Sequence, residues 1–244
     1  MWSLYDRLIE RVPRDGDAIV RACVGTSWTA VLTKAGRIGV AATPPSRSSA
    51  PFDAGRYEGM ALAEAAKQVK SWDFAEAGVG LAAINAAINV DARFGVTENP
   101  DAFLRYRDRA AGRKVAVIGH FAYLERRLAD LCDLYVLERK PGDNDYPDPA
   151  CEYILPEMDL VFITGSALAN KTMPRLLQLC SRAFTVISGP STTMDESLFD
   201  LGADALCGFL VTDAQRCLSL VGEQTGIFSC GRMVCLEKTG ETLK

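Results

Sequence analysis

The sequence predicts an α/β protein in two parts, an α+β part over residues 1–95 and a Rossmann-like parallel sheet over residues 96–244. In the first part, three β-rich runs follow one another closely and two helical stretches come after them, which is typical of a meander with helices. In the second part, short apolar runs alternate with amphipathic helices, which indicates a parallel sheet covered on both faces. The 244 residues are 48% hydrophobic and 24% charged, so the chain can bury a sizeable core.

The first part begins with a predicted helix over residues 3–11. Lys34, Ala35 and Gly36 supply the turn between its second and third strands. A long loop with several Pro and Ser residues follows the third strand, and loops of this length are often functional. The predicted strands are 17–24, 28–33 and 38–42, the loop is 43–57, and the later helices are 57–69 and 76–89.

The second part opens with a polar connector and then repeats a strand–helix pattern. Each strand is a short apolar run that ends in a small or polar residue, and this order is Rossmann-like. The predicted strands are 114–118, 134–137, 159–163, 184–187 and 205–211. Helices are expected after the first strand as far as residue 130, and at 174–182, 194–201 and 213–222.

Charge and hydropathy exclude several classes of protein. The net charge is −4, whereas a nucleic-acid partner needs a basic surface, so none is expected. No apolar run approaches the roughly 18–20 residues that span a bilayer, and the first residues do not form a signal peptide, so we expect a cytoplasmic protein with no membrane partner. The eight cysteines form no C-x-x-C pair and there is one histidine, so we expect reduced, packed cysteines and no zinc site of the usual spacing.

Small and polar residues stand at four of the predicted strand ends. In open α/β sheets, ligands bind outside the carboxyl ends of the strands. We therefore expect these ends to face one crevice and to carry the ligand site. The residues are Gly119, His120, Glu138, Thr164, Gly165, Ser166, Gly189, Pro190 and Ser191.

His120 and Glu138 are the two residues of this set with titratable side chains. His120 can serve as a general base, a metal ligand or a hydrogen-bonding anchor, or it can cap the following helix. Glu138 lies nineteen residues after Gly119, the spacing of a carboxylate that accepts from ribose hydroxyls, although a solvated strand end has the same sequence. The later glycines of a dinucleotide fingerprint are absent after Gly119, which disfavours a close approach to pyrophosphate.

The turn after the fourth strand combines a helix start with additional hydroxyl groups. Thr193 and Glu196 match a capping box, so we expect them to be mainly structural. Ser191 and Thr192, together with the free amides of a helix terminus, would form a site for an anion.

Candidate residues also occur outside the strand ends. Asn170 and Lys171 precede another helix and could point at a ligand, although Lys171 is more typical of a solvated surface charge. Asn85 is the one strongly polar residue of an apolar helix, so its amide either stitches the core or binds something at the interface between the parts.

The loop after Glu138 is rigid and acidic. Its carboxylates could bind a hard cation, but an exposed acidic turn explains them equally simply. Cys151 in the same loop could be a soft metal ligand or a packed side chain. The acidic residues are Asp143, Asp145 and Asp148.

Six segments together resemble the family named "Putative heavy-metal chelation". They are GVAATP (39–44), GLAAINA (80–86), VAVIGHF (115–121), PACEYILP (149–156), ITGSALANKT (163–172) and GPST (189–192). The resemblance covers nearly the whole chain. It implies an N-terminal domain like that of enolase, a C-terminal Rossmann-like domain, a site between the two and a homodimer.

Three functions are compatible with the sequence. The first is binding of a metal, or of a small anionic or metal-complex ligand, between the two domains, with a divalent or heavy metal ion held by His120, Glu138 and Cys151. The second is a nucleotide- or S-adenosylmethionine-dependent enzyme with Glu138 on the ribose. The third is a non-catalytic interaction module, because a fold alone supplies no reaction.

Overall fold

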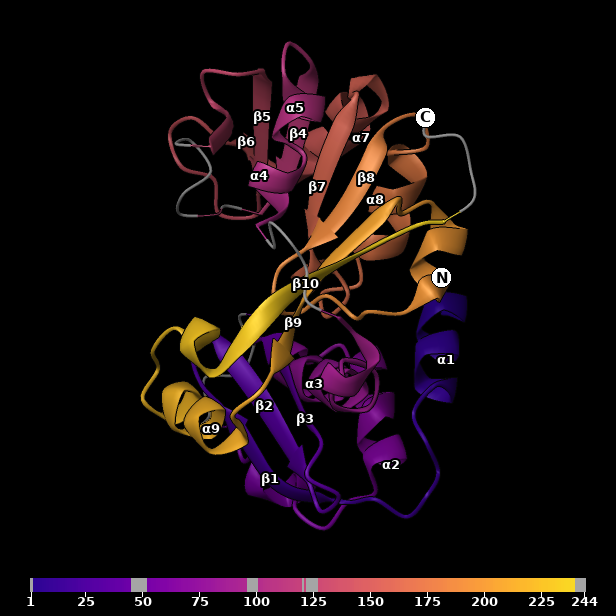
Figure 1. Ribbon diagram of the computed structural model, residues 1–244, viewed down its shortest axis with the longest axis vertical. Coiled ribbons are helices and arrows are strands. Elements are labelled where there is room, and N and C mark those ends of the chain that lie inside the picture. Colours follow the sequence, from indigo (N-terminus) through magenta and orange to yellow (C-terminus); the bar gives the residue numbers. More distant parts are fainter. Residues whose placement is uncertain (1, 45–51, 96–100, 120, 122–126, 240–244) are drawn as a thin grey trace.

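The computed structural model describes residues 2–44, 52–95, 101–119, 121 and 127–239. Two lobes are each built around their own sheet (Figure 1). One sheet has three antiparallel strands, and the other has seven strands of which six are parallel. The predicted fold class, an α+β lobe followed by a Rossmann-like lobe, is confirmed.

The N-terminal lobe is a meander covered by one long buried helix. That helix, α3, is almost entirely apolar and begins at the cap Asp73, whose carboxylate accepts from two backbone amides of the first turn. Gly39 lets α3 approach β3, because a Cβ there would lie 2.1 Å from the backbone nitrogen of Ala86. The elements are α1 (Ser3–Glu10), β1 (Ile19–Val24), β2 (Trp28–Thr33), β3 (Ile38–Ala42), α2 (Leu62–Ala66) and α3 (Phe74–Ile88).

The C-terminal lobe has the strand order β6-β5-β4-β7-β8-β9, with β10 added antiparallel to β9. The first six strands follow the 3-2-1-4-5-6 order of a Rossmann sheet, and the order reverses between β4 and β7. The strands are β4 (Lys114–Ile118), β5 (Asp133–Glu138), β6 (Tyr146–Pro147), β7 (Leu160–Thr164), β8 (Phe184–Ser188), β9 (Ala205–Val211) and β10 (Gly231–Glu237).

One helix of the C-terminal half packs against the N-terminal sheet. The helix α9 lies beside the strands of this sheet (Figure 1). Its residues Cys217 and Val221 join a hydrophobic cluster with Ala30 of β2 and Val40 of β3. The core therefore crosses the predicted domain boundary, which itself stays a prediction. The remaining helices of the described residues are α4 (Ala102–Arg105), α5 (Arg107–Ala110), α7 (Cys151–Ile154), α8 (Met173–Leu179) and α9 (Ala214–Gly222).

Short 3₁₀ helices occupy several connections, and one of them corrects a sequence-based expectation. Asp195, not Thr193, caps the segment Glu196–Leu201, because its carboxylate accepts from the amide of Ser197 at 2.9 Å. The predicted capping box is therefore wrong. The other 3₁₀ helices are Gly55–Tyr57, Lys67–Lys70, Asp91–Arg93, Asp148–Ala150, Leu155–Glu157, Gly165–Ala167 and Ile227–Cys230.

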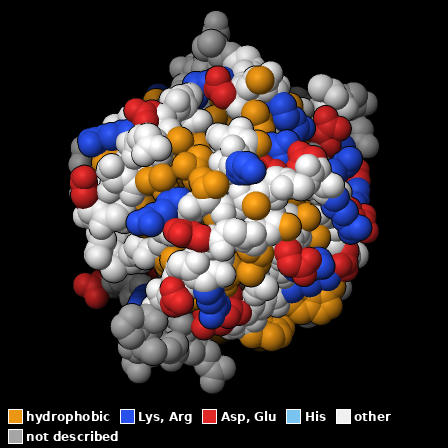
Figure 2. Space-filling model, turned by 90° about the horizontal axis from the view of Figure 1, so that it is seen from below, with side chains coloured by type: hydrophobic (Ala, Val, Ile, Leu, Met, Phe, Trp, Pro, Cys, Tyr) orange, Lys and Arg blue, Asp and Glu red, His pale blue; other side chains and the backbone are white. Residues whose placement is uncertain are grey.

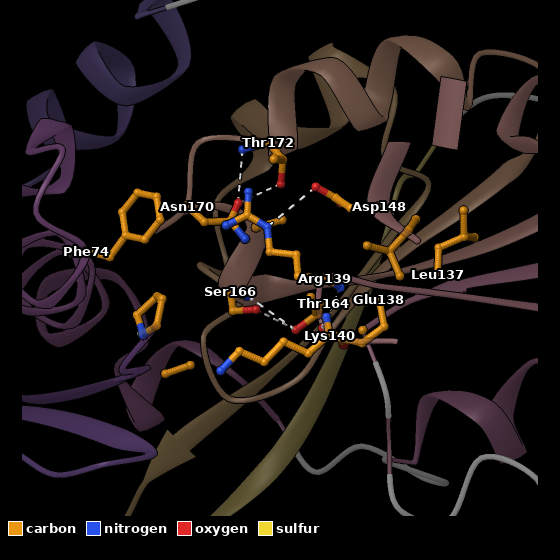
Figure 3. A pocket seen from close by; sticks show the side chains of 15 residues that line it. Phe74, Leu137, Glu138, Arg139, Lys140, Asp148, Thr164, Ser166, Asn170 and Thr172 are labelled. Carbon is orange, nitrogen blue, oxygen red and sulfur yellow. Dashed lines mark hydrogen bonds and ion pairs between the residues drawn. The ribbon is translucent and has the colours of Figure 1, made fainter. Parts of the chain in front are cut away.

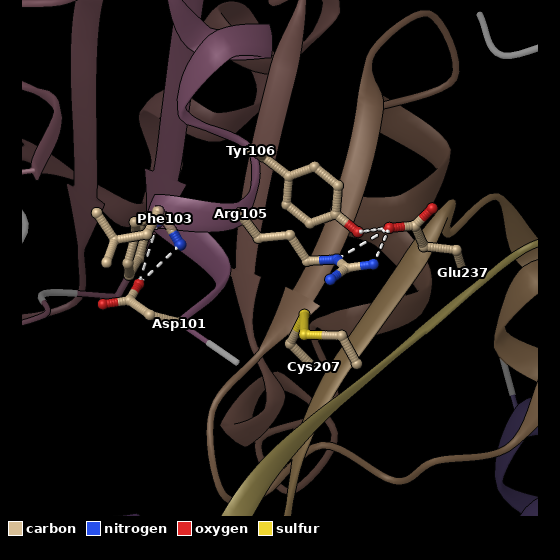
Figure 4. Close-up of a disulfide and its surroundings, with 8 residues drawn as sticks. Asp101, Phe103, Arg105, Tyr106, Cys207 and Glu237 are labelled. Atoms are coloured by element: carbon tan, nitrogen blue, oxygen red, sulfur yellow. Dashed lines mark hydrogen bonds and ion pairs between the residues drawn. A yellow bond between two sulfur atoms is a disulfide. The ribbon is translucent and has the colours of Figure 1, made fainter. Parts of the chain in front are cut away.

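The strand β10 and its disulfide were not anticipated. Cys207 and Cys235 face each other in the β9–β10 register and form a disulfide beside Tyr106 and Glu237 (Figure 4). The expectation of reduced cysteines is thus wrong for this pair, because the sequence pattern gave no strand that would bring them together. The six other cysteines are free.

The surface mixes charges of both signs. On the face at the base of the N-terminal lobe, basic and acidic side chains alternate, with small apolar patches between them (Figure 2). Among the residues that the structure describes, no helix has the length and apolar character needed to cross a bilayer.

Candidate functional site

A cleft lies between the lobes at the carboxyl ends of the parallel strands. It consists of two adjoining cavities of about 470 and about 620 Å³. Both are lined by Ala42 of the β3 edge and by Gly119, Thr164 and Ser166, which follow or end the strands β4 and β7. The cavities therefore meet where the strand order reverses, the usual ligand position in such sheets.

The smaller cavity, which we name the polar compartment, is lined by hydrogen-bonding and charged side chains (Figure 3). The hydroxyls of Thr164 and Ser166 lie 3.0 Å apart. The carboxamide oxygen of Asn170 accepts from the hydroxyl of Thr172 at 2.6 Å, which fixes the amide group at the cavity wall. The other polar side chains of this compartment are Glu138, Arg139, Lys140 and Asp148.

Three consecutive charged residues enter the polar compartment from the end of β5. One carboxylate oxygen of Glu138 accepts from the amides of Arg139 and Lys140, at 2.7 and 3.4 Å, so the carboxylate is held against its own turn. The guanidinium of Arg139 lies 3.6 Å from the carboxylate of Asp148 and 5.9 Å from the ring centre of Phe74. The Lys140 side chain extends across the cavity on the side of Ser166 (Figure 3).

The larger cavity, the apolar compartment, is walled mainly by aromatic and sulfur-containing side chains and by the turn after β8. Its large apolar side chains come from three parts of the sequence: β2, the segment after β4, and residues 228–233. Predicted site residues Gly189, Pro190 and Ser191 form part of its wall. The large apolar side chains are Trp28, Phe121, Phe228 and Met233.

A buried polar cluster, the interlobe seam, joins α3 and β3 to the turn after β8. It consists of Asn85, Asn89, Ser191, Thr192 and Thr193, all at most 5% exposed. The amide nitrogen of Asn85 donates to the carbonyls of Val40 and Ser191, at 2.9 and 3.3 Å, and its oxygen accepts from Thr193 at 2.7 Å. Asn85 therefore lies at the interface and forms hydrogen bonds with residues of both lobes.

The other seam residues bond across the lobes in the same way. The Ser191 hydroxyl accepts from the amide of Ala42 at 2.7 Å, and the amide nitrogen of Asn89 donates to the carbonyl of Thr192 at 2.8 Å. The hydroxyl of Thr192 is buried and has no hydrogen-bond partner within the described ranges. Gly165 packs against the seam, since a Cβ there would lie 2.4 Å from the Thr192 nitrogen.

Lys171 is buried rather than solvated, which corrects the sequence-based expectation. Its ammonium donates to the carbonyl of Ala169 at 2.7 Å and to that of Ser71 in the N-terminal lobe. The ring centres of Trp72 and Phe74 lie 6.0 and 5.5 Å from this nitrogen. Burial lowers the pKa of Lys171 to about 8. Its backbone φ of +69° is left-handed, so the turn at the lobe interface is strained at this residue.

The described residues do not form a metal centre. Cys151 belongs to the hydrophobic core and lines neither compartment, and burial raises the pKa of its thiol to about 12. Within the part of the chain that the structure describes, no three His, Cys, Asp or Glu side chains form a group that could hold a metal ion. His120 lies outside the described residues. The predicted roles of His120, Glu138 and Cys151 as metal ligands stay predictions.

Sequence reasoning missed the residues that give the two compartments their character. Arg139 and Lys140 directly follow Glu138 at a predicted strand end, so the strand-end rule could have found them. Trp28 and Phe228 come from segments that are apolar for ordinary packing reasons, and nothing in their local pattern indicates a cavity.

Comparison with known proteins identifies the family. Two family models match the chain, over residues 5–88 and 101–238, and both carry the description "Putative heavy-metal chelation". The chain belongs to this family. The two matched segments together span both lobes, so the family assignment covers the α+β lobe as well as the Rossmann-like lobe.

Solved members of the family have the same architecture. A protein of unknown function from the DUF364 family of Desulfitobacterium hafniense superposes with a TM-score of 0.90 at 37% identity, over 98% of this chain and 99% of the other. A second one, from Pyrococcus horikoshii, gives 0.78 at 25% identity, over 96% and 98%. An uncharacterized protein of Methanocaldococcus jannaschii is 31% identical over 165 residues, which are 64% of this chain and 63% of that protein.

Proposed function

We propose that the chain binds a small anionic ligand, including a metal ion carried as an anionic complex, in the cleft between the lobes. The observation that carries this proposal is the polar compartment, where Lys140, Thr164 and Ser166 meet at the switch point of the sheet. Arg139 already faces Asp148, so Lys140 is the cation that meets the ligand's negative charge. A cavity of this size and lining fits a small molecule.

The proposal treats metal as cargo rather than as a resident ion. A preformed complex brings its own oxygen ligands, so the protein has only to recognise its charge and hydrogen-bonding groups. This accommodates the family description without a set of protein ligands in the described part of the chain. We also propose, as the sequence predicts, that the chain forms a homodimer and is located in the cytoplasm, where it binds this small-molecule ligand.

Isothermal titration with citrate and with preformed iron(III)–citrate tests the proposal. We expect binding by the wild type and weakening of at least about fivefold in Lys140→Met, which is about 1 kcal/mol for loss of one charge-assisted bond. Lys34→Met is the matched control, because Lys34 is an exposed lysine at the far end of β2. Equal binding by all three proteins would remove Lys140 from the site, and no binding of either probe would refute the proposal.

The predicted metal ligands are tested by titration with zinc chloride. His120→Ala, Glu138→Gln and Cys151→Ser should each weaken binding if these residues hold the ion. Unchanged affinity in all three variants would show that free metal is not bound through them.

The nucleotide alternative is favoured by one specific observation. Glu138 ends the second strand of the Rossmann order and lines the polar compartment, the position of a carboxylate that accepts from a ribose. A thermal-shift series with AMP, NAD and S-adenosylmethionine tests it, because a ligand of the native state must raise the melting temperature. An unchanged melting temperature at millimolar ligand would count against it.

A further inference from the structure

We infer that the ligand of this cleft joins a flat aromatic or heteroaromatic ring to an anionic group, with the ring in the apolar compartment and the anion at Lys140. This inference rests on the proposed function and extends it to the larger cavity. It specifies the chemical class of the ligand, which the anionic group alone leaves open.

The two compartments form one continuous space. Gly119, Thr164 and Ser166 line both cavities, as does Ala42 on the opposite side of the cleft. Gly119 presents no side chain there and has a φ of +96°, a conformation that favours glycine. A ligand can therefore lie across this shared wall, with its ends in environments of opposite character.

Two aromatic rings that line the apolar compartment, those of Phe121 and Phe228, pack against other aromatic side chains. Phe121 packs edge-to-face on the buried Phe103 at 5.1 Å. Phe228 packs on the buried Phe209 at 5.8 Å and on Trp28 at 6.5 Å, both edge-to-face. These supports fix the wall positions before a ligand arrives, which lowers the entropic cost of binding.

One of these rings is exposed although it borders an apolar cavity. Phe228 is 54% exposed, so a ligand that covers its ring would remove apolar surface from water, which favours binding. A planar ring inserted between Phe228 and the turn at Gly189 and Pro190 would cover it. Stacking or edge-to-face contact with an aromatic ring adds about 0.5–1.5 kcal/mol beyond burial, which favours a ring over an aliphatic group.

The charge of the polar compartment determines which chemical group the other end of the ligand carries. The Lys140 side chain is directed into the polar compartment, and the hydroxyls of Thr164 and Ser166 lie at the junction (Figure 3). An anionic group attached to the ring reaches this ammonium without leaving the cavity. Aromatic acids and nucleotides both have this chemistry, and the test separates them.

The test compares matched probes by titration: 2-naphthoate, 2-naphthylmethanol, acetate and AMP. We expect 2-naphthoate to bind at least tenfold more tightly than either the neutral ring or acetate. Phe228→Ser should weaken both naphthyl probes at least fivefold and leave acetate unchanged. Lys140→Met should weaken 2-naphthoate and acetate and leave 2-naphthylmethanol unchanged. Tyr153→Ser is the matched control, because Tyr153 is 84% exposed and lines neither compartment.

The outcomes separate this inference from the proposed function. AMP binding more tightly than 2-naphthoate, with the same dependence on Phe228 and Lys140, supports the inference and assigns the ligand to nucleotides. Binding of 2-naphthoate no tighter than acetate, or unaffected by Phe228→Ser, overturns the inference. Iron(III)–citrate binding that depends on Lys140 would then leave the proposed function standing. If neither 2-naphthoate nor iron(III)–citrate bound, the inference and the proposed function would both be refuted.

Discussion

Two sets of polar residues lie where the N-terminal lobe meets the carboxyl ends of the parallel strands, and they differ in what their polar atoms contact. In the interlobe seam, Asn85 and Ser191 are buried, and each bonds to a backbone group of the opposite lobe, the carbonyl of Ser191 and the amide of Ala42 respectively. In the polar compartment, Lys140 and Ser166 border a cavity of about 470 Å³. A position at a strand end therefore does not by itself distinguish a residue that holds the lobes together from one that faces a ligand.

The seam also covers a sheet edge. β3 is an edge strand, so its outer amides and carbonyls have no strand partner. Asn85 donates to the carbonyl of Val40, and the Ser191 hydroxyl accepts from the amide of Ala42. These side chains replace the missing strand and satisfy backbone groups that would otherwise be buried without partners. Substitution of seam residues should therefore reduce stability, whereas substitution in the polar compartment should reduce binding.

Replacement of Asn85 should give the largest effect. Asn85→Leu leaves two carbonyls and the Thr193 hydroxyl without their present partners in a buried site. We expect a loss of about 4 kcal/mol in the free energy of unfolding, since each buried group left unsatisfied costs about 1–3 kcal/mol. Urea denaturation measures it. The exposed Asn144, changed to Leu, should shift stability by less than about 0.5 kcal/mol. Equal losses in both variants would contradict a structural role for the seam.

Gly165→Ala should rank second, because the added Cβ meets backbone atoms of the seam. It would lie 2.4 Å from the Thr192 nitrogen and 2.7 Å from the Ser191 carbonyl carbon. We expect about 3 kcal/mol of destabilisation, at the upper end of ordinary overpacking costs. Gly226→Ala is the control, since nothing lies within 4 Å of a Cβ there and its φ is −71°. A Gly165→Ala protein as stable as the control would show that the turn after β8 can shift to accommodate the added Cβ.

Lys171 gives the third prediction, a pH-dependent one. Its folded-state pKa is about 8, below the ordinary lysine value of 10.5, so above about pH 8 the unfolded chain binds more protons than the folded chain. This residue's contribution to stability therefore rises with pH. From about pH 8 to 9.5, the wild type should gain roughly 1.5 kcal/mol relative to Lys171→Met.

Paired denaturation curves measure this gain, because the tyrosines and cysteines that titrate in the same range are common to both proteins. A stability difference that stays constant with pH would show that Lys171 is not shielded from water. The amount of the shift also reports whether the contact between Lys171 and Ser71 across the lobes persists in solution.

The sequence predicts the fold far better than it predicts the site. Apolar runs and turn residues locate the strands β1 to β5 and β7 to β9 because burial and periodicity are local properties. The strand β10 and the burial of Lys171 depend on contacts distant in the sequence, and no local pattern carries them. Asn85 is recognisable as unusual from its apolar helix, but its partners at Val40 and Ser191 come from other segments.

Ser191→Ala should produce a smaller loss than the preceding changes. It removes the acceptor of the Ala42 amide, which is half-buried at the end of β3, and leaves the Asn85 bonds in place. We expect about 1 kcal/mol of destabilisation, the net value of a typical hydrogen bond. In a double-mutant cycle with Asn85→Leu, the two losses should not add, because both residues hold the same edge of β3. Additive losses would indicate two independent contacts rather than one seam.

Lys140→Met should have the smallest effect on stability. It therefore distinguishes the polar compartment from the interlobe seam most clearly. The Lys140 side chain is exposed and reaches into a cavity, so its removal should change the free energy of unfolding by less than about 0.5 kcal/mol. The same variant is expected to lose affinity for anionic probes. Ser191→Ala should show the opposite pattern. Its free energy of unfolding should fall, and its affinity for anionic probes should change less than that of Lys140→Met. If Lys140→Met instead destabilised the protein as much as Ser191→Ala, the polar compartment would be part of the structural interface, and the separation between the two sets of residues would fail.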